Sequence, residues 1–226
     1  MLLSGLPGEE DVVTRNEPTL QKRTASEHIV QLFDTSESLI NVLSHFVTEA
    51  LHQDANVLVV ARPRNWDAVA VRLVQQGLPV GEAVRQSRIT FLSAATTMSR
   101  FMRNGIADPG LFSDVIGTLI ERLVATSPAG LYIYGEMVDL LAEEGDFHAA
   151  RQFEALWNGL GARYSFTLLC AYAAAHFAAP NAGSALDTIC RAHSQVRADA
   201  ADPLAMWLIA TDSPNSKPDL QGSAAQ

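Results

Sequence analysis

Four charged side chains stand just after apolar runs of the sequence, and their chemistry suits ligand binding. They are Asp34, Arg62, Arg64 and Glu136. A guanidinium group binds anionic ligands. Burial raises the pKa of a carboxyl at the end of an apolar run, so that it can accept a proton or anchor a ligand by a hydrogen bond. We therefore predict that these four residues contribute to a ligand-binding site.

Glu136 also has an interpretation without function. A helix is expected over residues 138–143, and a carboxylate near its first turn is stabilised by the helix dipole. Gly135 favours the first interpretation, because it lets the backbone bend and would expose the carboxylate. Both interpretations stay open from the sequence.

Trp157 and Tyr172 complete the set of candidate ligand-binding residues. Trp157 could line a pocket, with Asn158 beside it as a polar group, and Tyr172 ends an apolar run. The alternative for the tryptophan is packing in the core.

Cys190 and His193 are the candidate metal ligands. Their spacing places them on one face of a helix, which suits two ligands of one ion. A zinc site would also need Cys170, His176 or His28. His28 is expected at the amino end of a strand in a structural hydrogen bond, and Cys170 in an apolar run where burial raises the thiol pKa. We therefore expect no bound metal and no cofactor.

No nucleotide-hydrolysing loop or nucleophile motif is present in the sequence. A phosphate loop needs G-x-x-x-x-G-K-[ST] after a strand, whereas residues 61–66 read Ala-Arg-Pro-Arg-Asn-Trp. Pro63 also removes a backbone N–H donor there. There is no G-x-S-x-G elbow, and we predict that the chain is not an enzyme.

Apolar, β-branched runs alternate with amphipathic stretches along the chain. This rhythm predicts an α/β fold with a mostly parallel central sheet and helices on both faces. Ligands bind such sheets at the carboxyl ends of the strands, where the candidate residues stand. The predicted strands are 28–33, 56–61, 88–92, 131–134 and 166–172, the last closing the sheet. The predicted helices are 36–51 (capped by Ser36), 66–76, 80–86, 111–125, 138–143, 147–160 and 184–196.

The length of the chain and its composition favour one domain with extensions. The 226 residues, 48% of them hydrophobic, suit a single core over residues 27–197. Residues 1–26 lack helical or strand periodicity and are predicted to be disordered. Residues 198–226 form a C-terminal segment in which the apolar stretch 203–210 is expected to dock on the core or on a partner, with disorder after it.

The charge balance disfavours nucleic acid as a direct partner. There are 25 acidic residues against 16 Lys and Arg, a net charge of -9. No apolar stretch approaches the length of about 20 residues that a membrane span requires, and the first residues do not resemble a signal peptide. The two cysteines suit reduced thiols. We predict a cytoplasmic protein without direct nucleic-acid or membrane contacts.

Several short motifs follow one another in an order that carries a resemblance. The chain resembles the MEDS family, the sensory domain of methanogen and methylotroph proteins and of the dichloromethane regulator, whose members are similar to a RecA-like, circadian-clock ATPase core. Phe33 departs from the family, in which this strand ends in Tyr-Asp, and one hydroxyl is absent. The motifs are His28-Ile29-Val30-Gln31-Leu32-Phe33-Asp34, Gly135-Glu136-Met137-Val138, Glu154-x-x-Trp157-Asn158, Leu168-Leu169-Cys170-Ala171-Tyr172 and Cys190-x-x-His193-Ser194.

The resemblance implies a RecA-like three-layer sandwich without a phosphate loop and a bacterial sensory function. A small, hydrocarbon-type ligand would bind, and a partner such as a histidine kinase or a transcription regulator would receive the signal in trans. Homodimers are plausible for such folds. Two alternatives stay open: a degenerate RecA-like nucleotide-binding protein, and a protein-interaction scaffold without a ligand.

Overall fold

The computed structural model describes residues 26–127, 129–178 and 182–198. Its centre is a sheet of six strands in the order β3-β2-β6-β7-β1-β8, and every neighbouring pair is parallel. This confirms the predicted α/β class. The strands are β1 (Glu27–Phe33), β2 (Asn56–Ala61), β3 (Ile89–Ser93), β6 (Leu131–Gly135), β7 (Thr167–Ala173) and β8 (Gln195–Ala198).

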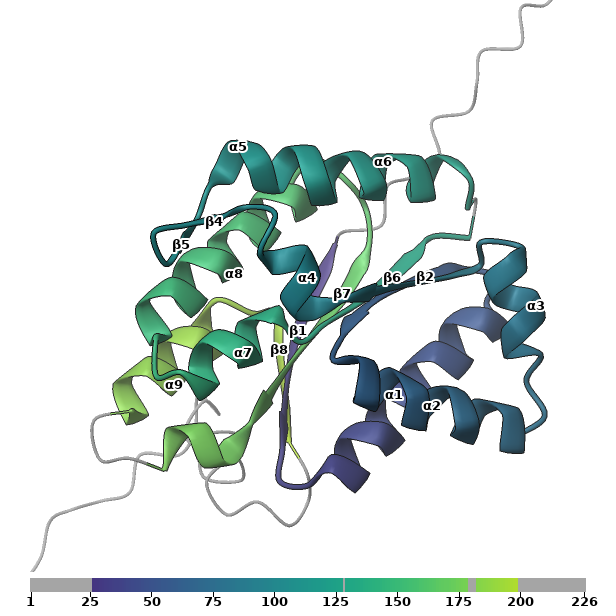
Figure 1. Ribbon diagram of the computed structural model, residues 1–226, viewed down its shortest axis with the longest axis horizontal. Helices are drawn as coiled ribbons and strands as arrows, with labels where there is room; N and C mark the ends of the chain where they lie inside the picture. Colours follow the sequence, from purple (N-terminus) through teal and green to yellow (C-terminus); the bar gives the residue numbers. More distant parts are fainter. Residues whose placement is uncertain (1–25, 128, 179–181, 199–226) are drawn as a thin grey trace, which may run out of the picture.

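Helices cover both faces of the sheet, as a parallel sheet requires (Figure 1). One face is covered by α1 (Ser36–His52), α2 (Pro63–Gln75) and α3 (Val80–Arg85). The opposite face is covered by α4 (Ala94–Met98), α5 (Pro109–Phe112), the π-helical turn η1 (Ser113–Gly117), α6 (Thr118–Ala125), α7 (Met137–Glu143), α8 (Phe147–Gly161), the 3₁₀ turn η2 (Ala174–Phe177) and α9 (Gly183–Arg191). A short antiparallel hairpin, β4 (Met102–Arg103) and β5 (Ile106–Ala107), lies beside α8.

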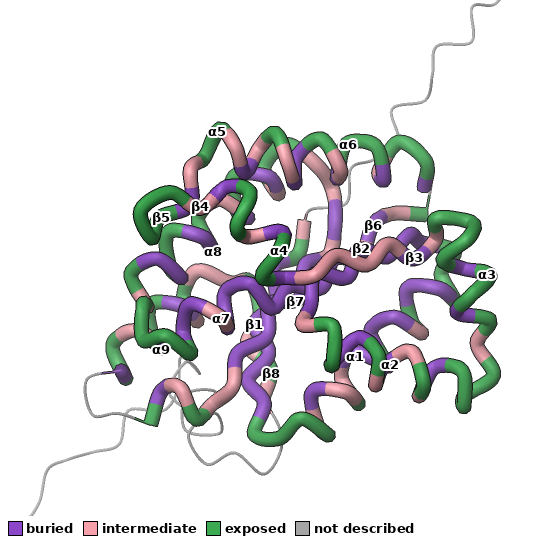
Figure 2. The backbone as a smooth tube through the Cα atoms, in the orientation of Figure 1, coloured by how far each residue is buried: buried purple, intermediate pink, exposed green. Residues whose placement is uncertain are grey.

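Two hydrophobic layers result, one on each face of the sheet. Figure 2 shows that the central strands are largely buried. Alternate strand residues contribute to opposite layers: Val57 and Val59 pack toward α1 and α2, whereas Leu58 and Val60 pack toward α4 and α7. This is why β2 has no polar alternation in its sequence and is buried along its whole length.

The end of the described chain differs from the prediction. Residues 184–196 were expected to form one helix, but α9 ends at Arg191 and β8 pairs with β1 through Ile29↔Gln195 to Leu32↔Ala198. The sheet is therefore closed by β8 and not by β7, which lies between β6 and β1. The short run of β8 shows weak periodicity, so only its pairing with β1 reveals it as a strand.

Two helix details also differ from the prediction. Thr35, and not Ser36, caps α1: its hydroxyl accepts a hydrogen bond from the Ser38 N–H, and the Ser38 hydroxyl completes a capping box. The single helix expected over residues 111–125 is broken by the π-helical turn η1. No helix within the described ranges is long and apolar enough to cross a bilayer. Residues 1–25 and 199–226, including the apolar stretch 203–210, lie outside the described residues.

Candidate functional site

The carboxyl ends of β2 and β6 hold a charged cluster centred on Glu136, which we call the rim cluster. Glu136 is 0% exposed, so the prediction that Gly135 exposes its carboxylate is wrong. The carboxylate accepts hydrogen bonds from the backbone N–H of Arg62 at 2.9 Å, from Asn65 Nδ2 at 3.0 and 3.1 Å, and from the Tyr134 hydroxyl at 2.9 Å. It stands at the N-cap position of α7 without capping that helix.

Arg62 joins this carboxylate to two others. Its guanidinium lies 3.4 Å from Glu136 Oε2, 2.7 Å from Asp139 Oδ2 and 2.8 Å from Glu143 Oε2. Asp139 also accepts a hydrogen bond from the Ala173 N–H at 2.8 Å, at the end of β7. The rim cluster therefore links β2, α7 and β7 by charge-assisted hydrogen bonds.

Burial and charge shift several pKa values in the rim cluster. Burial alone would lower the pKa of Arg62, but Asp139, Glu143 and Glu136 outweigh it and raise the value. The hydrogen bond and the charge of Arg62 lower the pKa of Glu143. Burial, together with the Glu136 charge, raises the pKa of Tyr134 well above its usual value. Arg62 thus keeps its charge across the neutral range.

A second group of titratable residues lies between the sheet and α8, and we call it the inner cluster. It comprises His28 at the start of β1, Cys170 in β7, Glu154 in α8 and His193 after α9, each with one potential ligand atom within 4.8 Å of the others. His28 Nε2 lies 3.3 Å from Cys170 Sγ and 3.2 Å from Glu154 Oε2. Cys170 Sγ lies 3.6 Å from Glu154 Oε2, and His193 Nε2 lies 3.4 Å from Glu154 Oε1.

The neighbours of the inner cluster orient its side chains. His28 Nδ1 pairs with Asn158 Oδ1 at 2.8 Å, and the Asn158 amide nitrogen donates to the Ala192 carbonyl at 3.1 Å. His193 Nδ1 donates to the Ile189 carbonyl at 2.7 Å. Both imidazoles therefore turn Nε2 toward Glu154. The Tyr172 hydroxyl donates to Glu154 Oε1 at 2.6 Å.

The inner cluster has strongly shifted pKa values. Burial alone would raise the pKa of Glu154, but His193 and His28 outweigh it and hold the pKa well below its usual range. Burial alone would lower the pKa of His193, and the Glu154 carboxylate raises it instead. Burial and Glu154 raise the pKa values of Cys170 and Tyr172 well above their usual ranges, as predicted for the thiol.

The six predicted ligand-binding residues are distributed over different environments. Arg62 and Glu136 meet in the rim cluster, Arg64 is exposed nearby on the first turn of α2, and Asp34 is exposed after β1. Tyr172 belongs to the inner cluster. Trp157 is 1% exposed and packs edge-on against Phe112 and Phe153 in the core. Their role in ligand binding stays a prediction.

Of the two candidate metal ligands, the structure places one, His193, beside other potential ligands. Among the described residues the inner cluster includes His193, together with His28 and Cys170, but does not include Cys190. His176 lies at the rim, 3.1 Å from Asp139 Oδ1. Sequence reasoning missed Glu154, although a carboxylate on the buried face of an amphipathic helix was a usable signal.

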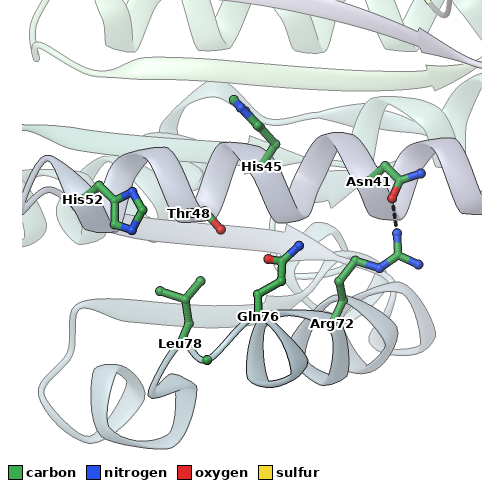
Figure 3. Close-up of a pocket in the computed structure, with 8 residues that line it drawn as sticks. Asn41, His45, Thr48, His52, Arg72, Gln76 and Leu78 are labelled. Atoms are coloured by element: carbon green, nitrogen blue, oxygen red, sulfur yellow. Dashed lines mark hydrogen bonds between the residues drawn. The ribbon is translucent and has the colours of Figure 1, made fainter.

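A crevice of about 510 Å³ runs between α1 and the end of α2 (Figure 3). Thr48 and Gln76 face each other across it, and Arg72 donates a hydrogen bond to Asn41 at one end. The Thr48 hydroxyl is buried and has no hydrogen-bond partner among the described residues. The crevice is lined by Asn41, His45, Thr48, His52, Arg72, Gln76, Gly77 and Leu78.

One comparison with known proteins finds a match. A family model described as MEDS, the methanogen/methylotroph, DcmR sensory domain, matches residues 27–194. The matched range begins with β1 and contains every residue of both clusters and of the crevice. No curated protein matches the chain.

Proposed function

Because this chain belongs to the MEDS family of sensory domains, we propose that it binds a small, hydrocarbon-derived molecule and signals this to a partner in trans. The partner would be a histidine kinase or a transcription regulator. The observation that carries the proposal is the extent of the family match, which covers almost the whole described fold. The sensory domain and the described domain are therefore the same unit.

The crevice between α1 and α2 is the ligand site that we propose. Its volume of about 510 Å³ is in the range of small-molecule sites, which combine apolar walls with a few polar groups. Leu78 and the aliphatic part of Arg72 offer apolar surface, and the Gln76 amide can both donate and accept a hydrogen bond.

The Thr48 hydroxyl supports a ligand with one polar group. A buried hydroxyl without a hydrogen bond costs about 1 to 3 kcal/mol relative to a satisfied one. A short alcohol, aldehyde or carboxylate that enters the crevice and displaces the atoms covering the Thr48 hydroxyl would supply the missing partner. The remainder of such a molecule would pack against the apolar wall.

The rim cluster argues against the alternative of nucleotide binding. Arg62 is engaged with Glu136, Asp139 and Glu143, so its charge is already neutralised where a phosphate would have to bind. Pro63 occupies the first turn of α2 and has no N–H to donate to a phosphate. On this basis we propose that the protein is not an enzyme and signals through binding alone.

A ligand screen tests the proposal. Native mass spectrometry of the purified chain and thermal shifts with short alcohols, aldehydes, haloalkanes and carboxylates should reveal a stabilising ligand. A ligand present at 100 times its Kd stabilises the folded state by about 2.7 kcal/mol. Gln76→Leu should weaken binding at least tenfold, whereas Gln75→Leu, one position away and not among the residues that line the crevice, should not.

Two outcomes would contradict this assignment. Equal loss of affinity in both variants would place the ligand elsewhere, and an Arg64→Ala effect on the same ligand would favour the rim. If no compound in the panel shifts the thermal transition, a ligand-free interaction scaffold becomes the better interpretation.

A further inference from the structure

The geometry of the inner cluster points to a bound metal. We propose that His28, Glu154, Cys170 and His193 form a closed, four-ligand site for a divalent transition-metal ion, for which Zn²⁺ fits best. This inference does not depend on the sensory function.

The distances among three of the four ligand atoms match neighbouring corners of a tetrahedron around zinc. Zinc bonds of about 2.0 to 2.3 Å at tetrahedral angles place neighbouring ligand atoms about 3.3 to 3.6 Å apart. The separations of His28 Nε2, Cys170 Sγ and Glu154 Oε2 are 3.2, 3.3 and 3.6 Å. His193 Nε2 lies 3.4 Å from the other carboxylate oxygen, Glu154 Oε1, and the four residues each offer a ligand atom within 4.8 Å of the others. An ion bound by all four residues would draw His193 Nε2 toward the other three ligand atoms.

The hydrogen bonds of both histidines select the tautomer in which Nδ1 carries the proton and Nε2 is free to bind a metal. Asn158 is oriented by its own bond to the Ala192 carbonyl, so its oxygen faces His28 and accepts the Nδ1 proton. The Ile189 carbonyl does the same for His193. Metal-binding histidines typically donate their second N–H to a carbonyl or carboxylate in this way. Each Nε2 lone pair is thus directed at the cluster centre.

The surroundings of His193 Nε2 suit a metal ligand better than a hydrogen-bond donor. The His193 side chain is 0% exposed, and its Nε2 has no hydrogen-bond partner within the described parts of the chain. A protonated Nε2 would have Glu154 Oε1 as an ion-pair partner at 3.4 Å, which is long for a hydrogen bond, and that oxygen already accepts one from Tyr172 at 2.6 Å. A metal ion would use the lone pair of the neutral ring instead. Tyr172 meanwhile satisfies the second oxygen of Glu154.

Charge also favours a divalent ion at this position. The Glu154 carboxylate and a Cys170 thiolate carry two negative charges, and no Lys or Arg of the described residues is hydrogen-bonded or ion-paired to them. Zn²⁺ would bring the site to neutrality while both histidines stay uncharged. Binding releases the Cys170 thiol proton to solvent.

The burial of the ligands defines the type of site. Cys170 and Glu154 are 0% exposed and the site has no ligand position open to solvent among these residues. Closed four-ligand sites are structural ones. The ion would connect β1, β7, α8 and the segment between α9 and β8, which holds the edge strand β8 in place.

The experiment is reconstitution of the full chain with defined metals. The protein is unfolded in guanidinium with a chelator, freed of metal, and refolded with Zn²⁺, with Co²⁺ or without metal. We expect one metal ion per chain by elemental analysis. The Co²⁺ form should show the intense visible bands of tetrahedral coordination and a thiolate-to-metal charge-transfer band.

The two cysteines supply matched variants. Cys170→Ser should remove the charge-transfer band and weaken Zn²⁺ binding at least 100-fold, whereas Cys190→Ser should change neither. The wild-type chain overturns the proposal if it refolds fully without metal and binds neither Zn²⁺ nor Co²⁺ at micromolar concentrations. A cobalt spectrum without thiolate bands, or one lost in Cys190→Ser, would overturn it equally, and neither result depends on the folding of Cys170→Ser.

Discussion

Glu136 and Glu154 are both fully buried carboxylates, but their partners differ in kind. Glu136 is held by Arg62, Asn65 and Tyr134, of which Arg62 carries a permanent charge. Glu154 is surrounded by two imidazoles, a thiol and a phenol, whose charges depend on protons or on a metal. A buried carboxylate with a permanent cation is a structural link. A buried carboxylate surrounded by imidazole and thiol groups, which have lone pairs to donate, can form a site that binds an ion.

The largest effect is expected where the permanent cation is removed. Arg62→Met removes the guanidinium that pairs with the buried carboxylates of Glu136 and Asp139, and loss of a buried ion-pair partner typically costs about 3 to 5 kcal/mol. Urea unfolding should show this loss. Arg64→Met, two residues away and exposed, should stay within about 0.5 kcal/mol. Equal effects of both substitutions would show that Arg62 is not the essential partner of these carboxylates.

Metal withdrawal should affect only the inner cluster. At a Zn²⁺ concentration 100 times its Kd, the ion contributes about 2.7 kcal/mol to the free energy of unfolding, and refolding with a chelator should abolish this amount. Arg62→Met should keep the same response to the chelator, because the rim cluster shares no residue with the inner one. If the wild-type chain is equally stable with and without metal, then Glu154 does not differ from Glu136 by binding an ion.

A smaller effect is expected from the phenol that supports Glu154. Tyr172→Phe removes the 2.6 Å hydrogen bond to Glu154 Oε1 while retaining the ring, and should cost about 1 to 3 kcal/mol. Tyr132→Phe is the control, because the Tyr132 hydroxyl donates its hydrogen bond to the exposed Gln53 at 2.9 Å. Thermal unfolding should rank the two substitutions in this order, and the reverse order would mean that the bond to Glu154 contributes little.

The smallest effect is expected in the crevice. Thr48→Val replaces an unpartnered buried hydroxyl by a methyl group of the same shape, so the apo chain should gain at most about 1 kcal/mol. Binding of a polar ligand should weaken at the same time. A clear loss of apo stability would show that the hydroxyl has a partner in solution.

The sequence by itself determined the class of the fold. The alternation of β-branched runs and amphipathic stretches predicted β1, β2, β3, β6 and β7 in their places, because the period of apolar residues is a local property. It also determined that Cys170 is buried in a strand. The motifs along the chain carried the resemblance that the family match confirms.

The tertiary structure alone decided the strand order and the two clusters. His28 is 130 residues from Asn158 and 142 from Cys170 along the chain, and Arg62 is 74 from Glu136. Crossover helices place strands side by side that are distant in sequence, and no local pattern encodes which strands become neighbours. Glu154 and β8 acquire their roles only from these long-range pairings. This is why the sequence named His193, Cys170 and His28 as possible ligands but not Glu154.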